Sequence, residues 1–509
     1  MMEPSEPAAD DTDMKSLHSP ALHLMCPEMI KHIVQFLDYK GKKMLRGVSS
    51  TLKNRVDSCG DKLVHCWRFS TRFSTHQMIK FADEIKTVLG FEVLDATDDG
   101  VAYLVKKHPE LLMFQLGTNI LLPKNDSVSQ LTSMGLNPIL SIPSLSSLII
   151  TRSTKIILEN SFKICSTQLQ TLNLSGIDGK AFDDVWFLQT LKQIRSTIEC
   201  LTLANTSISG EILIEFNETL PCLKSLNLSF CKLSNMGLLK MLQTCGSTLT
   251  SLNVSFTHIT GENLADNMVT LPCLRFLSIR YCTELSDEGM LKILQICKST
   301  LTSLEVSGTN ITGENWANYE GTLPCLEKLD LQNCKQLSNM GLLKILQICG
   351  SKLVSLTLKG TNITGENFAD NMVTLPCLRI LSLNKCTELS NMGLLKILQI
   401  CESTLTSLDV SFTHITGENW ADNIVTLPCL SILKLRHCKE LSNEGMLKIL
   451  QICESTLKIL NVTDTNITGE NVKLFSHKFH LYRGATRWGR PGARPPLAPE
   501  RGGRAPPAE

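Results

Sequence analysis

The sequence predicts an α/β repeat protein in which short parallel strands alternate with helices in a right-handed solenoid. Two observations lead to this prediction. The segment LTSLNVSFTHITGEN at Leu249 recurs in related form at Leu301, Leu353 and Leu405, with a period of 52 residues. Within each period an L-x-x-L-x-L pattern occurs twice, and its alternating leucines suit a short strand with one buried face. A chain of 509 residues built in this way escapes the usual size limit of a single compact domain.

The N-terminal part of the chain precedes the repeats. Residues 1–19 are acidic and have no apolar periodicity, so we expect them to be disordered. Residues 20–58 are predicted to form a small α-helical module, because apolar residues follow two stripes at helical spacing. The stripes are Ile30, Ile33, Val34 and Leu37, and then Leu45, Val48, Leu52 and Val56. Residues 59–88 are predicted to be a helical linker or N-terminal cap.

Residues 89–475 are predicted to form about fourteen strand-plus-helix turns, two per period, with alternating steps of 25 and 27 residues. The L-x-x-L-x-L half of each turn supplies the strand, and segments such as LSNMGLLKILQIC supply a helix behind an N-cap serine, Ser338 or Ser390. These are leucine-rich repeats. Because helices occupy more space than strands, we expect a horseshoe like that of ribonuclease inhibitor, with the strands on its concave face.

The residues beside the strand leucines differ from copy to copy, whereas the helix KILQIC is unchanged in four copies. This contrast admits two interpretations: exposed positions drift after duplication, or the concave face recognises a protein partner. On the second interpretation, the candidate substrate-binding residues are Arg275, Arg280, Tyr281, Glu327, Lys328, Asp330, Arg379, Lys434, Arg436 and His437.

Fifteen of the twenty cysteines recur in three periodic sets, which indicates packing positions inside the repeat. The sets are Cys222, Cys273, Cys325, Cys377, Cys429; Cys231, Cys282, Cys334, Cys386, Cys438; and Cys245, Cys297, Cys349, Cys401, Cys453. No C-x2-C or H-x3-H spacing occurs, so we expect neither disulfides nor a metal site, and reduced cysteines favour an intracellular protein.

The composition excludes several classes of function. Fifty Lys and Arg balance forty-nine Asp and Glu, which disfavours nucleic-acid binding. No window contains eighteen apolar residues, and acidic residues precede the first apolar run, so we expect neither a membrane span nor a secretory signal. No phosphate loop, nucleophile elbow or zinc-binding ligase finger is present, so we expect a protein that is not an enzyme and needs no cofactor.

The segment from Leu22 to Val56 resembles an F-box, with Glu28, Ile33, Leu37 and Val48 at the matching spacing and Pro27 one place late. The repeats are similar to those of F-box proteins with cysteine-containing leucine-rich repeats, as in NCKQLSNMG and KCTELSNMG. Together these resemblances imply a substrate receptor of an SCF-type ubiquitin ligase, cytoplasmic or nuclear, whose partners are the F-box adaptor, a cullin and a protein substrate. The adaptor-binding residues would be Pro27, Glu28, Ile30, Ile33, Leu37, Leu45 and Val48.

Two alternatives remain open. Leu22, Cys26 and Ile30 also fit the short box by which another class of receptor binds elongin. Alternatively, residues 20–58 only cap the array, and the protein is a binding or inhibitor scaffold without a link to a ligase.

Residues 476–509 are rich in Pro, Gly and Arg and have no apolar periodicity, so we expect a disordered tail. A basic tail of this kind is also compatible with RNA binding or a localisation signal. The array would then end without a polar cap, unless the tail folds back or a partner covers the last repeat.

Overall fold

The computed structural model describes residues 66–69, 74–84, 88–93, 96–116, 133–151, 164–177, 183–262, 264, 269–297, 300–319, 321–366, 368, 373–401, 403–418, 426–453, 456–468 and 480–482. The chain forms two compact units. Unit 1 comprises Met1–Ile311 and Asn315–Leu326, and unit 2 comprises Thr312–Glu314 and Glu327–Glu509. The F-box-like module, residues 20–58, lies outside the described residues.

Unit 1 is a parallel sheet in which each strand pairs with the next one along the chain. Its strands are β1 (Cys66–Phe69), β2 (Gly90–Val93), β3 (Met113–Leu116), β4 (Ser147–Ile150), β5 (Thr171–Asn173), β6 (Cys200–Thr202), β7 (Ser225–Asn227), β8 (Ser251–Asn253), β9 (Phe276–Ser278) and β10 (Ser303–Glu305). Its helices are α5 (Thr75–Glu84), α6 (Asp98–Lys107), α7 (Ser133–Leu140), α8 (Asp184–Ile194), α9 (Asn235–Cys245) and α10 (Asp287–Cys297), with the 3₁₀ helix η3 (Glu211–Glu215).

Unit 2 repeats the same plan. Its strands are β11 (Lys328–Asp330), β12 (Ser355–Thr357), β13 (Ile380–Ser382), β14 (Ser407–Asp409), β15 (Ile432–Lys434), β16 (Ile459–Asn461) and β17 (His480–Tyr482). Its helices are α11 (Asn339–Cys349), α12 (Asn391–Ile400) and α13 (Asn443–Cys453), with the short η6 (Gly350–Lys352). A further 3₁₀ helix, η5 (Glu314–Asn318), spans the point in the sequence where the two units divide.

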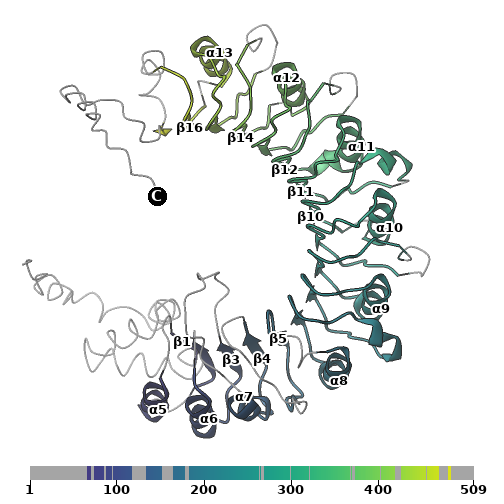
Figure 1. Ribbon diagram of the computed structural model, residues 1–509, viewed down its shortest axis with the longest axis vertical. Coiled ribbons are helices and arrows are strands. Elements are labelled where there is room, and N and C mark those ends of the chain that lie inside the picture. Colours follow the sequence, from purple (N-terminus) through teal and green to yellow (C-terminus); the bar gives the residue numbers. More distant parts are fainter. Residues whose placement is uncertain are drawn as a thin grey trace, which may run out of the picture. The chain divides into compact units, whose positions relative to one another are not determined.

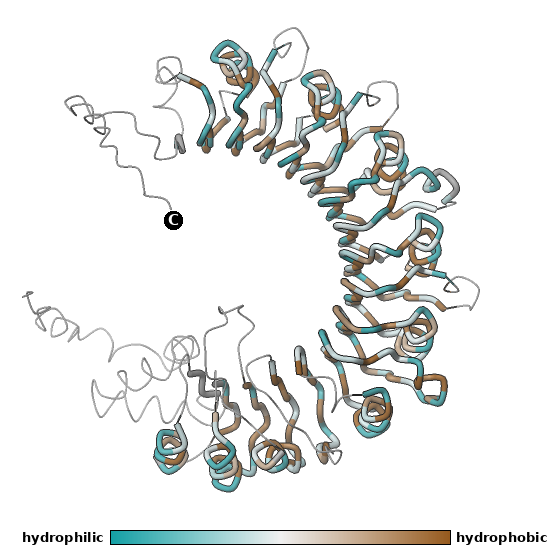
Figure 2. Tube along the Cα trace, viewed as in Figure 1, coloured by the Kyte–Doolittle hydropathy of each residue, from teal (hydrophilic) through white to brown (hydrophobic). Residues whose placement is uncertain are grey.

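In each unit the strands line one side and the helices the other (Figure 1), so the predicted α/β repeat architecture with a parallel sheet is confirmed. The strand leucines stay in register from turn to turn; for example Leu356 pairs with Leu381, and Leu381 with Leu408. All three are buried. Figure 2 shows hydrophobic residues on both the strands and the helices of successive turns, which therefore share a continuous apolar layer.

The predicted N-caps are confirmed. The hydroxyls of Ser338 and Ser390 accept hydrogen bonds from the backbone N–H groups of Gly341 and Gly393, each at 2.9 Å. Each bond satisfies one of the backbone donors that the first turn of a helix leaves unpaired. The polar residue that follows each serine binds the next turn, as Asn391 does by donating to the Thr416 hydroxyl at 2.9 Å.

Three predictions about element placement need correction. Strand β1 lies within 59–88, which was expected to be helical, and it pairs with β2, so the parallel sheet begins before residue 89. Strand β17 lies within the tail that was expected to be disordered, and Leu481 pairs in register with Leu460. Each short segment forms backbone hydrogen bonds with a neighbouring strand. Its own apolar periodicity is weak, so the sequence alone did not indicate a strand.

The third correction concerns the outer side of the repeats. Among the described residues, the NITGEN-type turns that follow β10, β12 and β16 contain no α-helix, whereas the turns after β9, β11, β13 and β15 do. Glycine and proline in ITGEN and TLPCL explain the difference, since both disfavour a helix interior. Strand-plus-helix turns therefore alternate with helix-free ones along this part of the chain.

The periodic cysteines divide into two groups. The described cysteines are all free thiols. Two of the predicted sets are buried as expected, but the set in TLPCL is not: Cys273, Cys377 and Cys429 are exposed. They lie in the turn before a strand, where the leucines on either side provide the buried contacts. Regular recurrence alone did not distinguish these positions from packing positions.

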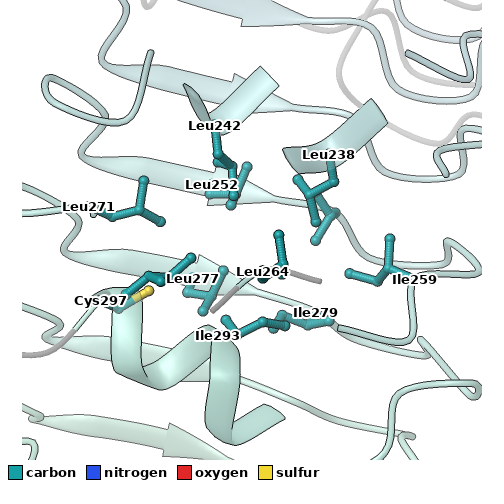
Figure 3. A pocket seen from close by; sticks show the side chains of 12 residues that line it. Leu238, Leu242, Leu252, Ile259, Leu264, Leu271, Leu277, Ile279, Ile293 and Cys297 are labelled. Carbon is teal, nitrogen blue, oxygen red and sulfur yellow. The ribbon is translucent and has the colours of Figure 1, made fainter. Parts of the chain in front are cut away.

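The packed interior offers no ligand site in the region that Figure 3 shows. A cavity of about 10 Å³ lies in unit 1 among α9, α10, β8 and β9, and Leu238, Leu252, Leu264 and Ile293 line it. A cavity of this size holds at most about one water and needs polar partners to do so. No described helix is both long and apolar enough to cross a bilayer.

Candidate protein-binding surface

The strand side of each unit presents the variable positions on a regular backbone. In β9, Leu277 points into the core, while the preceding Arg275 is exposed. The backbone carbonyl of Arg275 accepts hydrogen bonds from Thr302 and Ser303 of the next turn, at 2.8 and 2.9 Å. Rigid strands of this kind present side chains with little backbone entropy left to lose on binding.

From β5 to β16, each strand is followed by a tight turn whose tip has a left-handed backbone. The tip residue follows the strand by three positions, and its φ lies between 55° and 74°. Glycine or asparagine occupies several of these positions, as at Gly176, Asn205, Gly308, Asn333 and Gly360. These residue types tolerate the left-handed region with least strain.

Buried polar contacts fix these turns. Behind the tip at Phe256, the Thr257 hydroxyl donates to the Val254 carbonyl at 2.7 Å and lies 3.5 Å from the Cys282 sulfur. The Cys282 thiol in turn donates to the Val254 carbonyl at 3.2 Å. The same arrangement recurs at Thr361 and Cys386. These buried hydrogen bonds therefore fix the backbone conformation of the tip, whichever side chain the tip residue has.

Large side chains occupy the tips of three consecutive turns in unit 1. Phe230, Phe256 and Tyr281 have φ values of 59°, 58° and 55°. Their rings stack: the centroids of Phe230 and Phe256 are 4.1 Å apart with planes 10° from parallel, and those of Phe256 and Tyr281 are 4.6 Å apart and 18° from parallel. We call these three residues the aromatic stack. Left-handed backbone at such residues costs on the order of 1–3 kcal/mol each, and their stacking offsets only part of that.

A polar network borders the aromatic stack. The Arg280 guanidinium lies 3.7 Å from the Glu305 carboxylate, which also accepts a hydrogen bond from the Ser278 hydroxyl at 2.9 Å. The Arg280 carbonyl accepts the backbone N–H of Phe256 at 2.7 Å. Of the predicted substrate-binding residues in unit 1, the structure therefore brings Arg280 and Tyr281 together, and Arg275 stands apart at the other end of its strand.

The equivalent turns of unit 2 form a different cluster. Lys385, Phe412 and His437 occupy the tips that correspond to Phe230, Phe256 and Tyr281. The Phe412 and His437 rings stack with centroids 4.4 Å apart, and the Lys385 ammonium and Arg436 guanidinium lie 5.5 and 5.7 Å from the centre of the Phe412 ring. We call these four residues and Asp464 the cation-capped cluster.

Asp464 completes the cation-capped cluster. Its carboxylate lies 2.9 Å from Nε2 of His437 and 3.8 Å from the Arg436 guanidinium. The predicted residues Arg436 and His437 are thus brought together, but each already has an intramolecular partner. Ion pairs that remain accessible to solvent add about 0–1 kcal/mol to stability, so these side chains stay available for exchange with a partner's charges.

The remaining predicted residues lie in or directly before β11, β13 and β15 of unit 2. Glu327, Lys328, Arg379 and Lys434 are exposed. Asp330 differs from them, because its carboxylate accepts the backbone N–H of Gln332 at 3.0 Å and so shapes its own turn. Asp409 does the same with Ser411. Asp330 is therefore better explained as a turn residue than as a contact residue.

Sequence reasoning missed Phe230, Phe256 and Phe412 as surface residues. The available signal was the residue type at the turn tip: other copies have glycine or asparagine there, and a bulky residue breaks that local rule. Within the described residues, no group of three or more His, Cys, Asp or Glu side chains is placed to hold a metal ion. The surface can therefore offer stacking, charge pairing and hydrogen bonds.

Comparison with known proteins agrees with this architecture. A family model described as "Leucine Rich repeat" matches residues 219–242, 247–262, 270–294 and 402–418. Together with the parallel strand pairing and the periodic leucines, this match identifies leucine-rich repeats in these segments.

Several solved structures are similar to the chain. A chain of the yeast Rad7 and Elc1 complex is 16% identical with a TM-score of 0.42, and the match covers 93% of this chain and 98% of that one. The leucine-rich-repeat protein LIC12759 of Leptospira interrogans is 14% identical with a TM-score of 0.46, covering 81% and 100% respectively. The functional domain of InlJ from Listeria monocytogenes is 13% identical with a TM-score of 0.38, covering 76% and 70%.

Proposed function

We propose that this chain of leucine-rich repeats is the non-catalytic substrate-recognition subunit of an SCF-type ubiquitin ligase. One observation supports the recognition role above all: variable and mostly exposed charged side chains project from strands whose buried leucines and hydrogen bonds scarcely change from copy to copy. Such a rigid frame with varied side chains suits the binding of a folded protein or an extended segment.

The proposed link to a ligase depends on the F-box-like residues of the N-terminal module. Pro27, Glu28, Ile33, Leu37 and Val48 fit the spacing of that module. In this role the protein contributes proximity, by raising the effective concentration of a target lysine beside the conjugating enzyme.

The adaptor contact is tested by changing Ile33 and Leu37 to Asp in the full-length chain. Each apolar side chain buried in an interface contributes about 1.5–3 kcal/mol, so the double variant should lose co-purification with the F-box adaptor and cullin. The matched control is Ile214→Asp, an exposed apolar residue of η3. If the double variant still retains adaptor and cullin, the F-box assignment is wrong.

The same purification separates the alternative scaffolds. Recovery of elongin in place of the F-box adaptor, with loss in an Ile30→Asp variant, would support the elongin box. Recovery of a target protein with no adaptor and no cullin would support a binding or inhibitor scaffold, in which residues 20–58 act only as a cap.

The target-binding face is tested by charge reversal at Arg275 and Lys434. Both are exposed, and neither takes part in an ion pair within the described residues. The double change to Glu should release the protein target and leave adaptor binding unchanged. Lys192→Glu, on the helix side at α8, is the control. If the target is retained by the double variant, recognition uses another surface.

A further inference from the structure

The aromatic stack ends at Phe230, which is partly exposed. Phe256 is covered on both faces, by Phe230 and by Tyr281. The outer side of the Tyr281 ring rests against Gly308, where an added Cβ would lie only 2.5 Å from two ring carbons. Phe230 makes no second ring contact within the part of the chain that the structure describes, and it is 48% exposed.

The three rings of the aromatic stack occupy left-handed backbone positions that favour glycine or asparagine. The turns on either side of the aromatic stack use Asn205 and Gly308 at the same left-handed position. Either residue would meet the needs of the turn with less strain. The geometry of the turn therefore does not explain why three successive tips have bulky rings. Two of these rings are more than 40% exposed (Phe230 48%, Phe256 41%).

The second unit contains an internal copy that indicates which group such a ring binds. Lys385 occupies the position of Phe230, and its ammonium lies 5.5 Å from the centre of the Phe412 ring, the counterpart of Phe256. The Arg436 guanidinium lies 5.7 Å from the same ring. A cation placed over an aromatic face is attracted by the negative charge density of that face. In unit 2 two cations of the chain itself therefore lie over Phe412. In unit 1 Phe230 takes the place of the lysine, and Arg280 is the counterpart of Arg436.

We propose that the outer face of Phe230 binds an arginine side chain of a partner protein, and that the aromatic stack is an arginine-recognition site. Arginine is favoured over lysine for two reasons. The planar guanidinium stacks on a ring and is more weakly hydrated than an ammonium.

This site deepens the proposed recognition role, but it does not depend on the ligase link. It specifies the chemistry of one contact on the protein partner. A failure of adaptor binding would leave it standing, and a failure of arginine binding would leave the adaptor proposal intact.

The test uses the full-length chain and a fluorescein-labelled Gly-Ser-Arg-Gly-Arg-Gly-Ser peptide, with binding measured by fluorescence polarisation. The matched probe replaces both arginines with citrulline, which keeps the planar shape and removes the charge. We expect the arginine peptide to bind at least about tenfold more tightly than the citrulline peptide. A third peptide, with lysine in place of both arginines, should have an affinity between the two. Equal affinity for the arginine and citrulline peptides would overturn the proposal.

Two substitutions assign the binding to Phe230. Phe230→Asn reproduces the residue at Asn205 and Asn333, so the turn should still form, and the preference for arginine should disappear. Phe230→Lys imitates unit 2 and places a cation over Phe256, and it should abolish binding as well. Ile214→Asn, at an exposed apolar position of η3, should bind like the unmodified chain.

A third substitution keeps the test decisive if those variants unfold. Phe230→Trp enlarges the ring face, and tryptophan is the strongest aromatic partner for a cation. It should tighten binding of the arginine peptide about threefold. Unchanged or weaker binding in a folded Phe230→Trp protein, or full binding in Phe230→Asn, would show that the arginine peptide binds elsewhere.

Discussion

Two kinds of cysteine have opposite environments in this protein. Cys297, Cys349 and Cys401 are buried at the ends of helices, whereas Cys273, Cys377 and Cys429 lie exposed in the turns before strands. Because only the thiolate is a nucleophile, exposure and pKa together decide which thiol reacts. Burial raises the pKa of the Cys297, Cys349 and Cys401 thiols to about 12.

We therefore predict selective alkylation. With iodoacetamide at pH 8, Cys273, Cys377 and Cys429 should be modified within minutes, and Cys297, Cys349 and Cys401 should stay unmodified while the protein is folded. Mass spectrometry of tryptic peptides measures both sets in one sample, and denatured protein provides the control in which all six react. Equal rates for the two sets in the folded protein would contradict the assigned burial.

The buried thiols also predict a loss of stability in alkali. An unfolded cysteine has a pKa of about 8.5, below the value of about 12 to which burial raises the pKa of Cys245, Cys297, Cys349 and Cys401. The folded pKa lies above the unfolded one, so the stabilisation is complete below pH ~8.5 and declines as pH rises toward 12.

Each of these thiols lowers the free energy of unfolding by at most about 1.4 kcal/mol per pH unit in this range. Urea unfolding between pH 8 and 10.5 measures the slope. The triple variant Cys297→Ala, Cys349→Ala, Cys401→Ala should show a shallower slope than the unmodified chain, despite its lower stability at pH 8. An unchanged slope would mean that other groups control the alkaline transition.

At the scale of the elements, the contact between a turn and the next helix decides how closely successive repeats approach. Gly365 has a φ of +83° and lies against Gly393 at the beginning of α12. A Cβ at Gly393 would lie 1.8 Å from the Thr364 carbonyl oxygen. The same pair of glycines recurs at Gly417 and Gly445. Neither backbone can yield easily, because both belong to hydrogen-bonded turns.

Gly393→Ala should therefore destabilise the protein by at least about 3 kcal/mol, beyond the usual cost of overpacking a core position. Gly350→Ala is the control, since its nearest neighbour is the end of the Leu375 side chain, 2.9 Å away, and we expect a change within about 1 kcal/mol. Chemical denaturation compares the two variants. A similar small effect in both would show that the turn moves to accommodate the added methyl group.

The elements themselves were predictable where the sequence follows local rules. Leu356 and Leu381 sit in strands because alternating leucines specify a buried face, and Ser390 begins a helix because it is a favourable N-cap. The aromatic stack was not predictable in this way. Phe230 and Phe256 stand at turn positions that favour glycine or asparagine. Only the structure shows that their rings stack although 25 or more residues separate them in the sequence.

At the scale of the whole molecule, the end of unit 2 determines how the last repeats are held. The backbone N–H of His480 donates to the Lys458 carbonyl at 2.8 Å and joins β17 to β16. Strand β17 is the last strand among the described residues, and a paired strand protects the amides of its neighbour from solvent. The two strands should therefore open together.

Hydrogen exchange tests this pairing. We expect slow exchange at His480 and at Ile459–Asn461 in the full chain. Truncation after residue 479 should speed exchange across β16, and truncation after residue 482 should not. Fast exchange at His480 in the full chain, or the same protection of β16 in both truncated proteins, would show that β17 does not support the end of the array.

The near-identity of the repeats has a consequence for how the chain reaches its native state. Helices α11 and α12 share the ten residues NMGLLKILQI, and each is capped by a serine and linked to the following turn by an asparagine that binds a threonine hydroxyl. A folding chain can therefore dock either helix in the place of the other and find the same local partners, 52 residues out of register. Such misassembled states lose little local energy and escape only by unfolding, as is common in repeat proteins. The differences between copies on the strand side would then also favour packing of each repeat against its correct neighbour.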